Sequence, residues 1–340
     1  MTLPNFFVIG AQKAGTTSLY HYLAQHPQIY MSPVKEPYFF DHELSSDGEV
    51  VNGKSGRPDQ KNTRFSNIEE YRALFHGAGS ESAIGEASTP YIYVPGTAER
   101  IKKYVPDARV IAVLRNPADR AYSAFLHALR IGMEPLTDFG RALQEEEYRV
   151  RHNWHPALHY RNRGFYYEQL KRHYEVFGQE RIGVWLYEDL RKDPVGVARS
   201  IFHFLGVDDA FVPDTSSKHN VSGIPKNGVA RSIIRTMDTT ASAFLETFTS
   251  ASKVYPLLSK TRKRIQNMIV AKPPPIDNKI RAELIEGYRE DILKLQELIG
   301  KDLSGWLKDQ NHVSMTELST ARVKNVDPYE IVDQAASDLF

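Results

Sequence analysis

A strand, a small loop and a helix at the start of the chain constrain its fold more than any other feature. Residues 6–10 (FFVIG) are an apolar run typical of a buried strand, and residues 19–23 have a helical pattern. The loop between them, AQKAGTTS, is rich in small and hydroxyl residues and contains one lysine. Glycine allows the backbone to approach an anion closely, and a helix N-terminus adds N–H groups and a favourable dipole. This order predicts a phosphate-binding loop.

The position of the lysine distinguishes this loop from a Walker A loop. Walker A has the pattern G-x-x-x-x-G-K-[ST], with the lysine directly after the second glycine. Gly10 and Gly15 keep the glycine spacing, but Thr16 stands at the lysine position and Lys13 lies inside the loop. Lys13 would then lie beside the first phosphate, which favours a nucleotide with a short anionic chain and no metal. An ordinary glycine turn between strand and helix remains the alternative at this point.

A second candidate anion site follows another apolar run. Residues 108–114 read as a strand of the buried parallel kind, and the chain continues with Arg115, Asn116 and Pro117. Pro117 suits the first turn of a helix, and Ser123 lies two turns into that helix. Open α/β sheets bind ligands along the carboxyl ends of their strands. We therefore expect Arg115 and Ser123 at the same sheet edge as the loop.

The rest of the chain alternates strands with helices. Further strands are expected over residues 29–31, 83–85 and 182–187. Repeated βα units predict an α/β fold with a doubly wound, mainly parallel sheet flanked by helices and a P-loop-like nucleotide site. We expect a single domain over residues 1–311, insertions at about 41–66 and 230–275, and a polar tail over 312–340.

Composition excludes several kinds of function. The 340 residues include no cysteine, which removes thiol nucleophiles, disulfides and cysteine-ligated metal sites. The formal net charge is +1, so nothing in the overall charge suggests nucleic acid as a partner. No segment approaches the roughly 20 apolar residues that a membrane span requires, and no signal-peptide pattern precedes the first strand. A cytoplasmic location is the expectation; the oligomeric state is open.

The two anion motifs together resemble those of the sulfotransferases that use 3′-phosphoadenosine 5′-phosphosulfate (PAPS), in particular the bacterial and heparan-sulfate-type branch. The resemblance implies that Arg115 and Ser123 hold the 3′-phosphate and that residues 1–311 form one PAPS-dependent sulfotransferase domain. PAPS would be a co-substrate that leaves as adenosine 3′,5′-bisphosphate, and no metal would be required. The residues that the resemblance assigns to the 5′-phosphosulfate are Gln12, Lys13, Ala14, Gly15, Thr16, Thr17 and Ser18.

The resemblance extends along most of the chain. It places Tyr166, in the segment Gly-Phe-Tyr at 164–166, among the nucleotide-binding residues. The basic residues of 230–275 are either a solvated face or an acceptor-binding wall. A late basic loop that closes over the nucleotide is implied for Lys218, His219, Asn220 and Lys226.

Sulfuryl transfer needs a base for the acceptor proton and a cation for the leaving oxygen. Glu36 resembles the catalytic glutamate of the heparan-sulfate-type enzymes, and we expect the adjacent Phe39 and Phe40 to desolvate it and raise its pKa. His127 lies one helical turn after Ser123 and matches an active-site histidine of some N-sulfotransferases, so it is the second candidate base. Lys13 is the candidate for stabilising the leaving 5′-phosphate oxygen. The implied acceptor is a hydroxyl or amine of a saccharide or small molecule.

Two alternatives compete with this interpretation. A P-loop-type nucleotide kinase or NTPase would need a lysine at position 16 and an aspartate after a strand for Mg²⁺, and only Glu188-Asp189 imitates the second. A metal-binding hydrolase could use His152, His155 and His159, but Pro156 interrupts their helical spacing and no carboxylate pair accompanies them.

Overall fold

The structure, a computed structural model, describes residues 2–42, 65–216, 224–225, 270–271 and 273–308. The chain divides into one compact unit over Met1–Leu307 and a second over Lys308–Phe340. Most of the two predicted insertions and all of the predicted tail lie outside the described residues, so the domain boundary at 311 stays a prediction.

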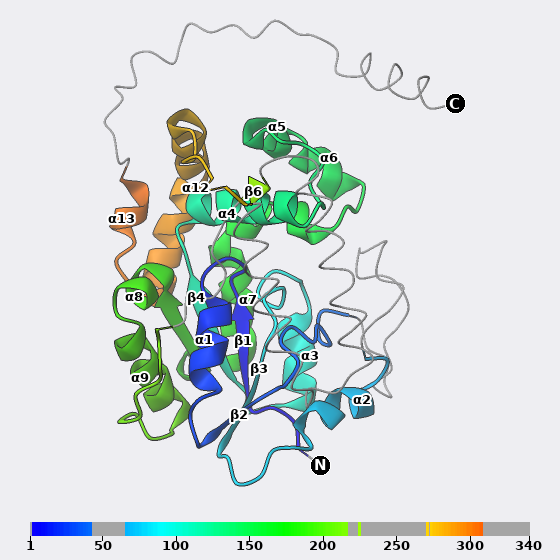
Figure 1. Ribbon diagram of the computed structural model, residues 1–340, viewed down its shortest axis with the longest axis vertical. Helices are drawn as coiled ribbons and strands as arrows, with labels where there is room; N and C mark the ends of the chain where they lie inside the picture. The colour runs from blue at the N-terminus through cyan, green and yellow to red at the C-terminus, as the bar shows by residue number, and fades with distance from the viewer. Residues whose placement is uncertain (1, 43–64, 217–223, 226–269, 272, 309–340) are drawn as a thin grey trace, which may run out of the picture. The chain divides into compact units, whose positions relative to one another are not determined.

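A five-stranded parallel sheet forms the centre of the first unit (Figure 1). All four strand pairs are parallel, which confirms the predicted fold class. The strand that is predicted over residues 83–85 extends two residues further, to Ala87, and includes Glu86. In sheet order the strands are β2 (Ile29–Met31), β3 (Ala83–Ala87), β1 (Phe6–Gly10), β4 (Arg109–Leu114) and β5 (Ile182–Leu186).

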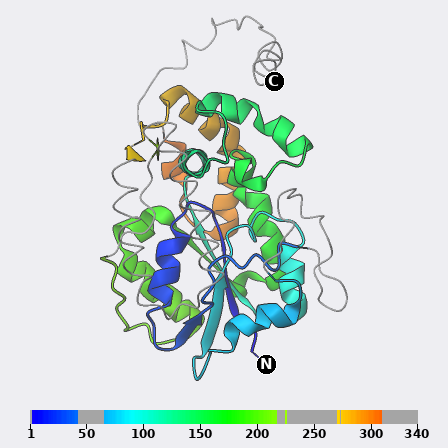
Figure 2. The same ribbon diagram turned by 45° about the vertical axis from the view of Figure 1, so that its right-hand side comes forward.

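Helices cover both faces of the sheet. Figures 1 and 2 show α1 (Thr16–Leu23) beside α9 (Pro194–Leu205) on one face, with α3 (Thr97–Tyr104) beside α7 (Tyr166–Phe177) on the other. The strands between them are almost wholly buried, as expected for a parallel sheet covered on both sides. Besides α4 (Pro117–Arg130), the other described helices and strands are α2 (Ile68–Arg72), α5 (Phe139–Gln144), α6 (Glu146–Arg151), α8 (Tyr187–Lys192), α12 (Asn278–Ile299), α13 (Ser304–Leu307), the short 3-10 helices η1 (Ala73–Phe75), η2 (Pro156–Leu158), η3 (Asn162–Gly164) and η4 (Gln179–Arg181), and the antiparallel pair β6 (Ile224–Pro225) and β7 (Val270–Ala271).

Helix α4 (Pro117–Arg130) begins directly after β4 and lies above the carboxyl edge of the sheet (Figure 1). Its start follows from the sequence Asn116-Pro117. The Asn116 side chain accepts hydrogen bonds from the N–H groups of Ala118 and Asp119, and Pro117 occupies the first turn, where its missing N–H costs nothing. Because β1 and β4 are neighbours in the sheet, the loop after β1 and the start of α4 lie side by side. The two predicted anion motifs therefore share one edge.

Candidate active site

The loop after β1 leaves the start of α1 open to an anion. Gly15 is the N-cap of α1 and has a φ of 87°, which a side chain would strain. A Cβ at this position would also lie 2.9 Å from Leu190 and 3.0 Å from Tyr187, so α8 packs directly behind the loop. Among the described residues no side chain caps α1, and its first turn holds no acidic residue. The N–H groups and dipole of this helix start are suited to a phosphate.

Arg115 connects the two anion motifs. Its guanidinium donates to the carbonyl oxygen of Lys13 over 3.2 Å and lies 4.8 Å from the centre of the Tyr187 ring. The Tyr166 hydroxyl donates to the Arg115 carbonyl oxygen over 3.1 Å. Tyr166, which is predicted to bind the nucleotide, is fully buried. Its hydrogen bond supports the backbone of Arg115. These contacts hold the arginine at a set distance from the phosphate loop.

Positive charge accumulates around Lys13. Burial, and next the charges of Arg130, Arg115 and Lys35, lower the pKa of the Lys13 ammonium to about 8, although Glu36 acts in the opposite direction. So many cations near one buried amine are unfavourable on their own. A bound anion would remove that repulsion, and the arginine, lysine and helix N–H donors match the chemistry of phosphate and sulfate oxygens. The residues present therefore fit a doubly anionic nucleotide.

His127 lies at the same site, on α4. Burial, followed by the charges of Lys13 and Arg130, lowers the pKa of the imidazole to about 3, so the ring is neutral at pH 7. Its Nδ1 lies 3.1 Å from Nη2 of Arg130. An arginine can only donate, so Nδ1 accepts and the ring proton of the neutral imidazole is on Nε2. His127 is therefore arranged to donate a hydrogen bond from Nε2.

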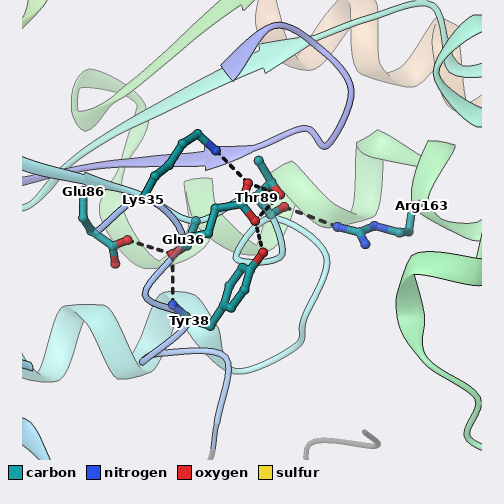
Figure 3. A network of polar contacts seen from close by, with 7 residues as sticks. Lys35, Glu36, Tyr38, Glu86, Thr89 and Arg163 are labelled. Carbon is teal, nitrogen blue, oxygen red and sulfur yellow. Dashed lines mark hydrogen bonds and ion pairs between the residues drawn. The ribbon is translucent and has the colours of Figure 1, made fainter. Parts of the chain in front are cut away.

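Glu36 lies in a network of donors (Figure 3). Lys35 Nζ lies 2.7 Å from Oε1 and forms an ion pair with it, and the Tyr38 hydroxyl donates to Oε2. The Thr89 hydroxyl lies 3.4 Å from both carboxylate oxygens, and the Thr89 carbonyl oxygen accepts from Arg163. The Glu36 side chain is about 24% exposed, so an acceptor molecule can reach it.

The prediction of a raised pKa for Glu36 is wrong. Burial does raise it, but the Lys35 charge, the hydrogen bonds from Lys35 and Tyr38, and the Arg163 charge together lower the pKa below its usual value. Phe39 and Phe40, the expected cause of desolvation, are turned into the core, where both pack against Tyr71. Glu36 is therefore ionised at neutral pH.

The predicted residues at the two motifs come together. Lys13, Glu36 and His127, the three candidate catalytic residues, lie close enough for Lys13 to interact electrostatically with each of the other two. Ser123 is buried on α4, one turn before His127. The other predicted residues of the phosphate loop and of the first turn of α1 are Gln12, Ala14, Gly15, Thr16, Thr17 and Ser18. Lys218, His219, Asn220 and Lys226 lie outside the described residues.

Sequence reasoning missed five residues of the site. Arg130 could have been found, because it follows His127 by three positions on the same helix. Thr89 follows the end of β3 at the ligand-binding edge of the sheet, which is a weaker signal. Nothing in the sequence connects Arg163 to the site. The other two missed residues flank Glu36 in the chain and are Lys35 and Tyr38.

The three histidines of the hydrolase alternative have separate partners. The ring of His152 contacts the Tyr148 carbonyl oxygen, that of His155 caps the turn at Ala157, and that of His159 contacts the Tyr93 hydroxyl. In the part of the chain that the structure describes, no three His, Cys, Asp or Glu side chains are grouped to hold a metal ion. Nor is any helix there long and apolar enough to cross a bilayer.

Comparison with known proteins agrees with the site. A solved sulfotransferase from Alicyclobacillus acidocaldarius is 33% identical, with a TM-score of 0.66, and the match covers 91% of this chain and all of the other. The mouse bifunctional heparan sulfate N-deacetylase/N-sulfotransferase 4 is 27% identical over 321 residues, which are 91% of this chain and 31% of that protein. Human carbohydrate sulfotransferase 15 is 29% identical over 160 residues, covering 37% of this chain and 27% of the relative.

The chain thus spans less than a third of the length of these two curated relatives. The model of the family described as "Sulfotransferase family" matches residues 4–211, which include β1 to β5 and every candidate catalytic residue. This match covers more than half of the chain. The chain belongs to the sulfotransferase family, which confirms the resemblance carried by its two anion motifs.

Proposed function

We propose that the protein transfers a sulfuryl group from PAPS to a hydroxyl or amine, with Glu36 as the base. One observation carries this proposal: a carboxylate lies within the cationic group that surrounds the phosphate-loop lysine. In-line transfer requires a base on the acceptor side of the sulfur and a cation on the leaving-group side. Lys13 and Glu36 provide both at one site. Arg115, with Ser123, would hold the 3′-phosphate and so orient the donor.

Glu36 and His127 then have different roles. Glu36 is ionised, partly exposed and able to accept a proton as the acceptor oxygen or nitrogen attacks sulfur. His127 is a poor base, because its protonated form is disfavoured and Nδ1 is engaged by Arg130. We assign it a donor role, in which Nε2–H binds a sulfuryl oxygen or the acceptor.

The proposed acceptor is a carbohydrate or a small metabolite. Two relatives are named for N-sulfation of heparan sulfate and for carbohydrate sulfation. A series of contacts leads from Glu36 through Thr89 to Arg163, whose guanidinium lies 5.3 Å from the centre of the Tyr93 ring. Trp154, about 39% exposed, lies on the same α6-to-α7 segment as Arg163. Exposed aromatic rings of this kind offer flat apolar surfaces with polar edges to a ligand.

The experiment is a screen of acceptors with isotopically labelled PAPS, read as a mass shift, with and without EDTA. Glu36→Gln keeps the shape of the side chain but cannot take the proton, so we expect turnover to fall about 10²–10⁴-fold with bisphosphate affinity retained. Parent-like turnover of Glu36→Gln at saturating acceptor would remove Glu36 from the mechanism. Mg²⁺-dependent binding of ATP tighter than that of the bisphosphate would instead favour the kinase alternative.

A further inference from the structure

The segment that carries Glu36 runs beside the end of β3 and is held in an unusual conformation. Its backbone donates to the carbonyl oxygens of Gly85 and Ala87, from Ser32 and Glu36 over 2.8 and 2.9 Å. Glu36 and Tyr38 have φ values of 61° and 60°, in the left-handed region that side chains disfavour. A side chain in this region crowds the neighbouring backbone, so both residues are strained. Contacts from the surroundings must therefore hold the base in place.

Ser88 provides one such contact from a fully buried position just after β3. Its hydroxyl donates to Oε2 of Glu86 over 2.7 Å and accepts from the Tyr38 N–H over 3.3 Å. A serine hydroxyl has one proton, so donation to Glu86 leaves a lone pair for the Tyr38 N–H. Glu86 is itself held, because the Tyr71 hydroxyl donates to its Oε1 over 3.1 Å.

We propose that Ser88, oriented by Glu86, is a positioning residue for sulfuryl transfer. It fixes the backbone of Tyr38, and the Tyr38 hydroxyl in turn holds the Glu36 carboxylate toward the site (Figure 3). Ser88 acts through Tyr38 and does not touch the reacting groups, because it is fully buried just after β3. The inference rests on the proposed role of Glu36 as base. It adds a buried polar chain, from Tyr71 to Glu36, that the family resemblance of the sequence does not indicate.

The first test is Ser88→Ala. Displacement of a reacting group by about 1 Å can cost roughly a hundredfold in rate, so we expect kcat to fall about 10- to 100-fold. The KM for PAPS and the Kd for the bisphosphate should change less than twofold. The acidic limb of the pH profile of kcat/KM should move to higher pH, because Glu36 loses part of the Tyr38 hydrogen bond that lowers its pKa.

Ser200→Ala on α9 is the matched control. The Ser200 hydroxyl also accepts and donates, from Trp185 Nε1 over 2.7 Å and to the Val197 carbonyl oxygen over 2.8 Å. It belongs to neither anion motif and has no contact with the Glu36 network among the contacts of the described residues. Its loss should lower stability without changing kcat or the pH profile.

A double-mutant cycle identifies the route. If Ser88 acts through Tyr38, then the kcat of Ser88→Ala/Tyr38→Phe should equal that of Tyr38→Phe alone, whereas additive losses would overturn the inference. Glu86→Gln retains an acceptor for Ser88 and should lose less than threefold in kcat, while Glu86→Leu should match Ser88→Ala. Should Ser88→Ala not fold, Tyr38→Phe replaces it, and a parent-like kcat and pH profile of that variant overturn the proposal.

The two proposals fail in different ways. A slow Glu36→Gln enzyme together with a stable Ser88→Ala enzyme of parent kcat would refute the positioning role alone. Parent-like turnover of Glu36→Gln would refute the base assignment, and the positioning role with it.

Discussion

We expect Lys13 to make nucleotide binding depend on pH. Burial and the nearby cations lower the pKa of its ammonium to about 8 in the free protein, and a phosphate in the loop should restore it toward 10.5. Only the protonated amine attracts the phosphate fully. With a pKa of about 8, the protonated fraction falls from roughly nine tenths at pH 7 to roughly one tenth at pH 9. The affinity for adenosine 3′,5′-bisphosphate should therefore weaken about tenfold over this range, or about 1.4 kcal/mol.

Titration calorimetry at pH 7, 8 and 9 measures this effect. Repeating the pH 8 titration in two buffers of different ionisation enthalpy should show uptake of about half a proton on binding. Lys13→Met keeps the length of the side chain and removes its charge, so its affinity should be lower and nearly independent of pH. The same pH dependence in Lys13→Met as in the parent, or none in the parent, would refute the assignment of Lys13 to the phosphate.

Three further outcomes are expected. Arg115→Ala should weaken bisphosphate binding by about 2–4 kcal/mol, while Arg109→Ala, at the other end of β4, should leave it unchanged; equal affinities would place the 3′-phosphate elsewhere. His127→Phe should lower kcat without removing a limb of the pH profile, because the ring is neutral above pH about 3; loss of a limb would make His127 the base. Burial, as the largest cause, raises the pKa of Glu86 from 4.5 to about 7, so the folded state holds a proton that the unfolded chain releases, and parent stability should fall as pH rises from 4.5 to 7. Chemical denaturation should show Glu86→Gln gaining about 3 kcal/mol relative to the parent between pH 4.5 and 8; a constant difference would contradict the raised pKa.

The central strands could be predicted because each is a short, continuous apolar run. β1 and β4 are buried along nearly their whole length, and such strands carry an unbroken signal in the sequence. The last two residues of β3 could not be predicted in the same way. Glu86 looks like the end of a strand, and a buried carboxyl group is tolerable there because Ser88, Tyr71 and Tyr91 hydrogen-bond to it.

The candidate site, like the sheet, could be predicted from the sequence only in part. Lys13, Arg115 and His127 lie in motifs that belong to single βα units, so local order in the sequence was enough to group them. The environment of Glu36 combines its chain neighbours Lys35 and Tyr38 with two residues distant in sequence. These are Thr89, 53 residues after Glu36, and Arg163, 74 residues after Thr89. Lys35 and Tyr38 lower the pKa of Glu36 most, but sequence order does not show that these side chains turn toward the carboxylate while Phe39 and Phe40 turn into the core. The local pattern of aromatic residues therefore predicts the opposite direction for the pKa.

The contact between Arg115 and the Lys13 backbone has a consequence for selectivity. The Tyr187 ring lies against the Arg115 guanidinium and would also contact a side chain at position 15. The same residue therefore packs against both anion motifs. The separation of the two motifs is therefore set by the fold, before any nucleotide binds. We expect a ligand whose phosphates have the matching separation to bind both motifs without reorganising the protein. In the proposed binding mode, a longer polyphosphate chain at the 5′ end adds charge at the first motif without filling the second, so we expect the spacing of the motifs to discriminate between nucleotides.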